Sequence, residues 1–183
     1  MARLKLMDRY FVRGLVDGSL SCLGVVIGAS AAIGLAAPAK WIIIAAGLGG
    51  GIANGLSNIL GALMAEKAVV YKRFEEVEKS MLKSKAVRDS EVGERRIRKI
   101  YSSGIMDGLA TILGALLPVI PFFIIGGNLA LWASVGLTLG LLFVLGAYVG
   151  KISKENLISS GVKMAAFGAA VAVIAALIKM AMP

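Results

Sequence analysis

The chain has no histidine and only one cysteine, and these absences remove much of the usual chemistry of metal sites and catalysis. Without imidazole there is no histidine-based acid–base catalysis and no histidine ligand for a metal. Because Cys22 is alone, it forms neither an internal disulfide nor a thiolate cluster. The phosphate-binding pattern of a glycine-rich loop followed by Lys-Ser or Lys-Thr is also missing. We therefore expect neither an enzyme nor a tightly bound cofactor.

Charged residues are scarce as well, at 17% of the chain, whereas 58% of the 183 residues are hydrophobic. Segments with few or no charges occupy residues 14–39, 41–65, 108–150 and 156–178. One crossing of a bilayer needs about 20 residues, so the third segment is long enough for two crossings. We predict that it is divided by Pro118, Pro121 and the turn signal Gly126-Gly127-Asn128. The sequence thus predicts an all-α integral membrane protein with five transmembrane helices.

The placement of lysine and arginine predicts the orientation of these helices. Four basic residues precede the first span, eleven lie between Lys67 and Lys99, and Lys151 and Lys154 separate the last two spans. The positive-inside rule then places the N-terminus in the cytoplasm and the C-terminus on the far side. The net charge of +9 reflects this topology and contact with anionic membrane lipids. The membrane topology accounts for the basic residues, so we expect no nucleic-acid partner.

The chain divides into three parts on this basis: residues 1–65 with helices 1 and 2, residues 66–103 as a cytoplasmic helical extension, and residues 104–183 with helices 3 to 5. We expect the second span to continue as a helix to about Leu82, turn near Ser84, and return as a short helical hairpin. Two Glu-x-x-Glu pairs in this extension could gather a divalent cation through their oxygens, namely Glu75, Glu78, Glu91 and Glu94. An ordinary solvated helix surface is an equal alternative, because basic residues are interleaved with them.

Asp17 is the only charged residue between Gly14 and Ala39, inside the first span. A carboxylate in hydrocarbon costs several kcal/mol, so such residues usually face a bundle interior or a water-filled path and handle ions or protons. The pattern Asp-Gly-x5-Gly begins at Asp17 and again at Asp107, and Asn54 begins a third copy with an amide in place of the carboxylate. Spans one–two and three–four therefore resemble parallel repeats, a transporter construction with sites near the repeat interface.

The Asp-Gly pattern has a structural alternative, since aspartate is a favoured N-cap of helices. For Asp107, which follows Lys99 closely, capping and ion handling remain equally open. For Asp17 the apolar flanks Phe11-Val12 and Leu15-Val16 favour ion handling.

Small residues four apart predict where helices approach each other. The first span carries such residues at Gly14, Gly18, Gly24 and Gly28. Packing within one chain would explain them. Five helices, however, enclose little space for a polar path, and we therefore expect a homodimer with the first span at its two-fold seam.

Several stretches resemble the vacuolar iron transporter family. They are Asp17-Gly18 followed by Val25-Val26-Ile27-Gly28 in the first span, residues 114–122 in the third, and residues 160–170 in the fifth. The five-helix count, the topology and the cytoplasmic extension fit as well, so the resemblance covers nearly the whole chain. It implies a dimer that exports cytosolic Fe²⁺ or a related divalent metal in exchange for protons, with the Asp17 position in the pathway.

The second span departs from that family's pattern. Members usually carry Ser-Met-x-x-Gly-Glu, whereas this chain has Ser57-Asn58-Ile59-Leu60-Gly61-Ala62. The Asn58 amide replaces a thioether, and the carboxylate at position 62 is missing. Glu66 lies one turn further along the same helix face and could substitute for it. The cytoplasmic extension is also shorter than the family's metal-binding domain.

Our hypothesis from the sequence is a multi-pass, proton-coupled transporter of divalent cations such as Fe²⁺ or Mn²⁺, moving them out of the cytoplasm. The metal ion is the substrate, and the membrane is the plasma membrane if the chain is prokaryotic. The residues expected along the ion pathway are Asp17, Asn54, Asn58, Glu66 and Asp107. The alternative is a non-transporting membrane scaffold or accessory subunit of the same fold, in which the glycines serve packing alone.

Overall fold

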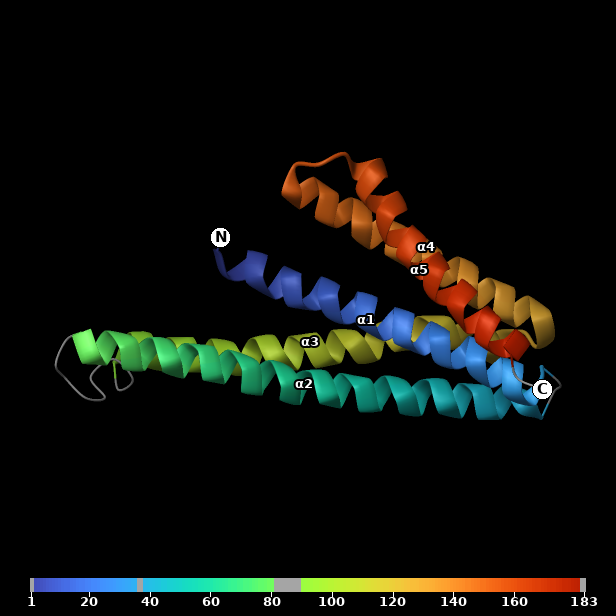
Figure 1. Cartoon of the computed structure of the whole chain (residues 1–183), viewed down its shortest axis with the longest axis horizontal. Helices are drawn as coiled ribbons and strands as arrows, with labels where there is room; N and C mark the ends of the chain where they lie inside the picture. Colours follow the sequence, from blue (N-terminus) through green and yellow to red (C-terminus); the bar gives the residue numbers. More distant parts are fainter. Residues whose placement is uncertain (1, 36–37, 81–89, 182–183) are drawn as a thin grey trace.

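The computed structural model describes residues 2–35, 38–80 and 90–181, and these residues form five α-helices and no β-strand (Figure 1). Each helix is long and apolar enough to cross a membrane, which confirms the predicted fold class. The helices are α1 (Ala2–Ile33), α2 (Ala39–Ser80), α3 (Glu91–Ile124), α4 (Gly127–Ser153) and α5 (Leu157–Ala181). Leu82 and Ser84, where we expected α2 to end and the chain to turn, lie outside the described residues.

The division of residues 108–150 differs in detail from the prediction. α3 runs through both Pro118 and Pro121 and ends at Ile124, so only the glycine turn separates it from α4. Prolines are tolerated in membrane helices because neighbouring helices and hydroxyl side chains bond the disturbed backbone. Each proline lacks an N–H, so the carbonyls of Gly114 and Leu117, four residues earlier, lose their helical donor. The Ser134 hydroxyl of α4 donates to the Pro118 carbonyl oxygen at 2.5 Å and links α4 to α3 at this level. The turn itself contains Gly127 at a φ of +67°, a conformation that glycine adopts without strain.

The helices form two unequal groups. α2 and α3 lie antiparallel along their length, and α1 packs against both of them, while α4 and α5 form a separate hairpin (Figure 1). This hairpin meets the rest of the bundle near the C-terminal end of α1 and diverges from it toward the N-terminal end (Figure 1). Near the C-terminal end of α1, apolar contacts join the two groups. They involve Val26, Ile43, Val119, Phe122 and Ala130. The N-terminal half of α1 therefore packs mainly against α2 and α3.

Aromatic side chains mark two levels along α2. Trp41 is 59% exposed at one end, where it meets the Phe123 ring edge-on at 6.4 Å. Tyr71 lies about 30 residues further on, which is about 45 Å along a helix. That length matches a bilayer with its headgroup regions, whose interfaces favour tryptophan, tyrosine and lysine. The part of α2 beyond Tyr71 then extends outside the membrane, as the predicted cytoplasmic hairpin requires.

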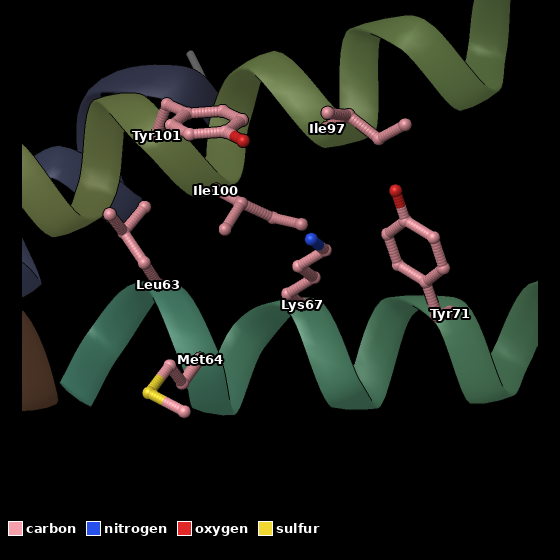
Figure 2. Close-up of a pocket in the computed structure, with 7 residues that line it drawn as sticks. All are labelled: Leu63, Met64, Lys67, Tyr71, Ile97, Ile100 and Tyr101. Atoms are coloured by element: carbon pink, nitrogen blue, oxygen red, sulfur yellow. The ribbon is translucent and has the colours of Figure 1, made fainter. Parts of the chain in front are cut away.

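A groove between α2 and α3 lies at the second of these levels (Figure 2). Lys67 and Tyr71 project from α2 toward α3, with the Lys67 ammonium 5.5 Å from the centre of the Tyr71 ring (Figure 2). Next to the groove, and sharing Ile100 with its lining, Val70 and Phe74 of α2 pack with Ile100 of α3 in a small buried cluster. The two helices therefore stay together outside the expected membrane because they have an apolar core of their own.

The backbones of α1 and α3 touch at glycines. A methyl group added at Gly18 would lie 1.9 Å from the Thr111 carbonyl oxygen, and one added at Gly114 would lie 2.4 Å from that of Leu15. Gly14 meets the Asp107 carbonyl oxygen in the same way. Gly24 and Gly28, in contrast, have no atom within 4 Å of such a methyl group. The first two glycines of the predicted seam thus pack within the chain, and only the last two are open.

We expect Gly18→Ala to prevent folding or to lower the melting temperature strongly, because the methyl group would collide with rigid backbone rather than with a movable side chain. Overpacking typically costs about 1–3 kcal/mol even where side chains can adjust. The matched control is Gly136→Ala, since that position in α4 is open. Thermal unfolding in detergent measures both variants, and equal melting temperatures would contradict the close α1–α3 contact.

Candidate ion-binding site

Asp17 lies in the interior of α1 and is bonded to two amides of α2. Its Oδ2 atom accepts a hydrogen bond from Asn58 Nδ2 at 2.6 Å and another from Asn54 Nδ2 at 3.1 Å. Asn54 follows Trp41 by about 20 Å along α2, so the cluster lies near the middle of the expected bilayer. The structure thus brings together three of the five predicted pathway residues.

The N-cap alternative is wrong for both aspartates. α1 begins at Ala2 and α3 begins at Glu91, so Asp17 and Asp107 each lie several turns inside a helix. The cap of α3 is instead Ser90, whose hydroxyl accepts from the Gly93 backbone N–H. We expected the third helix to start near Asp107, whereas α3 already begins at Glu91, so Asp107 is not at its N-terminus.

Two hydroxyl groups complete the Asp17 cluster. Asn58 Nδ2 also donates to Thr111 Oγ1 of α3 at 2.9 Å, and Asn54 Nδ2 also donates to Ser21 Oγ of α1 at 2.9 Å. Each hydroxyl in turn donates to the backbone carbonyl four residues earlier, Ser21 to Asp17 and Thr111 to Asp107. Three helices therefore contribute to one polar network.

Our sequence reasoning missed Ser21 and Thr111, although the repeat contained a signal for them. In both Asp-Gly copies a hydroxyl residue stands four positions after the aspartate. In a helix this spacing puts the hydroxyl one turn away, within reach of the aspartate carbonyl. The repeat therefore specifies hydroxyl groups as well as carboxylates.

The network offers hard oxygen ligands and no soft ones. One carboxylate, two amides and two hydroxyls lie together, whereas Cys22 is buried in another direction, 3.6 Å from the Gly47 carbonyl oxygen. Carboxylate, amide and hydroxyl oxygens suit Mg²⁺, Ca²⁺ and Mn²⁺, while thiolates and thioethers favour softer metals. The half-buried position of Asp17 leaves this cluster accessible at the α1–α2 surface.

Asp107 has a different environment from Asp17. It is fully buried, and both carboxylate oxygens are taken by Arg13 of α1: Oδ1 accepts from Nε at 3.2 Å, and Oδ2 accepts from Nη2. The Arg13 side chain is 56% exposed, so the pair extends from the interior to the surface. The two aspartates of the repeat are therefore not equivalent.

Glu66 lies outside the Asp17 cluster. It accepts a hydrogen bond from the buried Tyr10 hydroxyl of α1, toward the N-terminal end of that helix. Position 62, where the related family usually has glutamate, is a buried alanine that adds no ligand. Among the residues that the structure describes, Asp17 is therefore the only carboxylate bonded to the amides of α2.

The four glutamates of the hairpin are not gathered into one group. Glu75 pairs with Lys79 at 2.7 Å and Glu91 pairs with Arg95, each on its own helix. Among the described residues, no three side chains of the His, Cys, Asp and Glu types lie close enough to share a metal ion. Metal gathering by these glutamates therefore stays a prediction.

Comparison with known proteins identifies a family and a relative for this chain. The model of the VIT family matches residues 64–180. These residues include α3, α4, nearly all of α5 and the part of α2 from residue 64 onward. An uncharacterized protein of Methanocaldococcus jannaschii is 51% identical over 174 residues, covering 94% of this chain and 88% of that protein. That relative's name assigns it no activity.

We expect Asn58→Leu to destabilise the bundle, because it removes a donor from the Asp17 carboxylate and the link to Thr111. Leaving a buried polar group without its partner costs about 1–3 kcal/mol. Ser57→Leu on the exposed neighbouring position is the matched control. Thermal unfolding in detergent should show a melting temperature lower by several degrees for the first variant only. Equal values for the two variants would mean that the network contributes no stability.

Proposed function

This chain belongs to the vacuolar iron transporter (VIT) family, and on that premise we propose that it is a proton-coupled transporter that exports divalent cations such as Fe²⁺ or Mn²⁺. Membership indicates metal ion transport by a multi-pass membrane protein. The choice of cation, the coupling to protons, the outward direction and the plasma membrane location belong to the proposal.

The Asp17 network is the observation that supports this proposal most. Placing a carboxylate near the middle of a membrane costs free energy, so proteins usually keep one there only where it handles ions or protons. Here the carboxylate accepts from two neutral amides of α2, one of which also bonds Thr111 of α3, and no basic side chain in the described part of the chain bonds to it. Its oxygens are therefore not already paired with a cationic group.

The two amides suit every step of an exchange between metal and proton. An amide offers N–H donors to an ionised carboxylate and a carbonyl oxygen to a protonated one or to a cation. In this structure Asn54 and Asn58 donate to Asp17 through their N–H groups. Rotation of the amide groups would turn their oxygens toward a bound cation. The chain can thus exchange cations for protons without histidine.

The ligand set argues for hard divalent cations. Asn58 stands where the family usually has methionine, so the site lacks the thioether that favours softer metals. We propose that Mn²⁺ is handled at least as well as Fe²⁺, and that Cu⁺ is not a substrate. The hairpin glutamates would serve as an outer gathering site, and Glu66 as a further oxygen group between the hairpin and Asp17.

A second copy of the chain would supply a second Asp17 carboxylate, which would strengthen the binding of a divalent cation. We propose a homodimer through the C-terminal half of α1, where no atom of the described residues lies within 4 Å of a methyl group added at Gly24 or Gly28. Gly14 and Gly18 do not take part, because α3 already covers them.

The dimer is tested by Gly24→Leu, which we expect to shift the purified protein from dimer to monomer because the larger side chain separates the two α1 helices. Gly136→Leu is the matched control, since Gly136 is also open but lies on α4. Size-exclusion chromatography with light scattering measures the mass of each. A dimer of unchanged stability in the Gly24 variant would place the seam elsewhere.

The transport proposal is tested by Asp17→Asn in proteoliposomes that contain a pH-sensitive dye. We expect wild-type protein to couple Mn²⁺ movement to proton movement, and the variant to lose both by at least tenfold while it stays folded. Asparagine preserves size and removes only the charge. Thr138→Val, which changes a buried hydroxyl of α4 away from the site, is the control for a general effect on packing.

Two results would count against the proposal. Wild-type rates in the Asp17 variant would show that the carboxylate is not in the pathway. The absence of transport by wild-type protein, for Fe²⁺ and Mn²⁺ alike, would favour the scaffold alternative.

A further inference from the structure

Arg13 and Asp17 are four residues apart on α1, and this spacing places their side chains on one face of the helix. An arginine and an aspartate at this spacing commonly form an ion pair. The charge of Asp17 does act on the Arg13 guanidinium, but no hydrogen bond joins the two side chains in the described structure. Arg13 turns instead toward α3 and bonds Asp107.

Arg13 is held in this position from two sides. Asp107 binds it through two nitrogen atoms, Nε and Nη2, in the fork geometry that arginine forms with carboxylates. The Tyr10 ring lies on another side, 5.4 Å from the guanidinium carbon. Asp107 is fully buried and cannot follow the arginine outward, whereas the Arg13 side chain is more than half exposed and has room to move. The position of Arg13 therefore depends on Asp107.

We propose that Asp107 is a positioning residue that keeps Arg13 away from Asp17, so that the Asp17 carboxylate stays free for a cation. This inference rests on the proposed function, because it assumes that Asp17 binds the transported ion. Arg13 is in effect a cation tethered one helical turn from the binding site. Without Asp107 it would pair with Asp17 and compete with the substrate.

Tethering makes this competition strong. A group on a short link to its partner acts at an effective concentration in the millimolar range or above. A free guanidinium beside Asp17 would therefore compete with any divalent cation that is present at lower concentration. Because the arginine competes only for the empty site, the cation concentration for half-maximal transport should rise more than the maximal rate falls.

The experiment compares three variants of the full chain in proteoliposomes, with Mn²⁺ as the probe. In Asp107→Asn, which keeps the shape but removes the charge, we expect the Mn²⁺ concentration for half-maximal transport to rise at least tenfold. In Arg13→Gln/Asp107→Asn, which removes the competitor as well, that value should return to within about twofold of wild type. Arg13→Lys should raise it a few-fold, because lysine lacks the two-point fork that holds the arginine on Asp107.

Removing one partner of a buried ion pair also destabilises a protein, so each variant is first checked for folding by size-exclusion chromatography and thermal unfolding. Arg13→Lys keeps the charge at an exposed position, and it decides the question if Asp107→Asn does not fold. Thr138→Val is the control for a loss of stability without a change of charge.

Three outcomes separate the possibilities. A purely structural ion pair would lower the melting temperature of the single variants and leave the half-maximal Mn²⁺ concentration unchanged in every folded one, which would overturn this inference. A double variant as weak as Asp107→Asn would overturn it too, because the arginine would then not be the competitor. Failure of wild-type protein to transport Mn²⁺ would count against the proposed function itself.

Discussion

The backbone contact between α1 and α3 is the constraint on which the rest of the structure depends. Gly18 lies directly against the Thr111 carbonyl, and Gly114 lies against that of Leu15, so the two helices approach as closely as backbones can. This contact sets the height of Asp17 relative to Thr111 and of Arg13 relative to Asp107. α2 then reaches both helices through Asn58. The polar network exists because small residues let three helices meet.

The repeated aspartates show how one sequence pattern can serve two purposes. Both copies place an aspartate, a glycine and a hydroxyl residue in the same helical register. Asp17 faces neutral amides, whereas Asp107 faces a guanidinium and is fully buried. The Asp107 carboxylate has a cationic partner in Arg13, whereas the Asp17 carboxylate has only neutral hydrogen-bond partners among the described residues. The difference comes from the neighbouring helices and not from the repeat.

Most of the fold could be predicted from the sequence, because long apolar segments and basic flanks determine membrane helices directly. The prolines misled us, because a membrane helix tolerates them where neighbouring helices cover the disturbed backbone, and the sequence does not show those neighbours. Asp17 and Asn54 were predicted as pathway residues from the repeat, and Asn58 from its place in the second-span pattern of the family. The Arg13–Asp107 pair was not, because residues 94 positions apart meet only through the α1–α3 contact. The side of the membrane on which each chain end lies stays a prediction.

α2 is one unbroken helix of 42 residues, about 63 Å long, and both amides of the network are attached near its middle. A stiff helix does not bend to absorb a movement at one end, so a tilt or rotation of its outer part also moves Asn54 and Asn58. The small apolar cluster of Val70, Phe74 and Ile100 fastens that outer part to α3, which carries Thr111. The part of α2 beyond Tyr71 and the amides of the site therefore belong to one continuous helix, so we expect a movement of that part to reach Asn54 and Asn58.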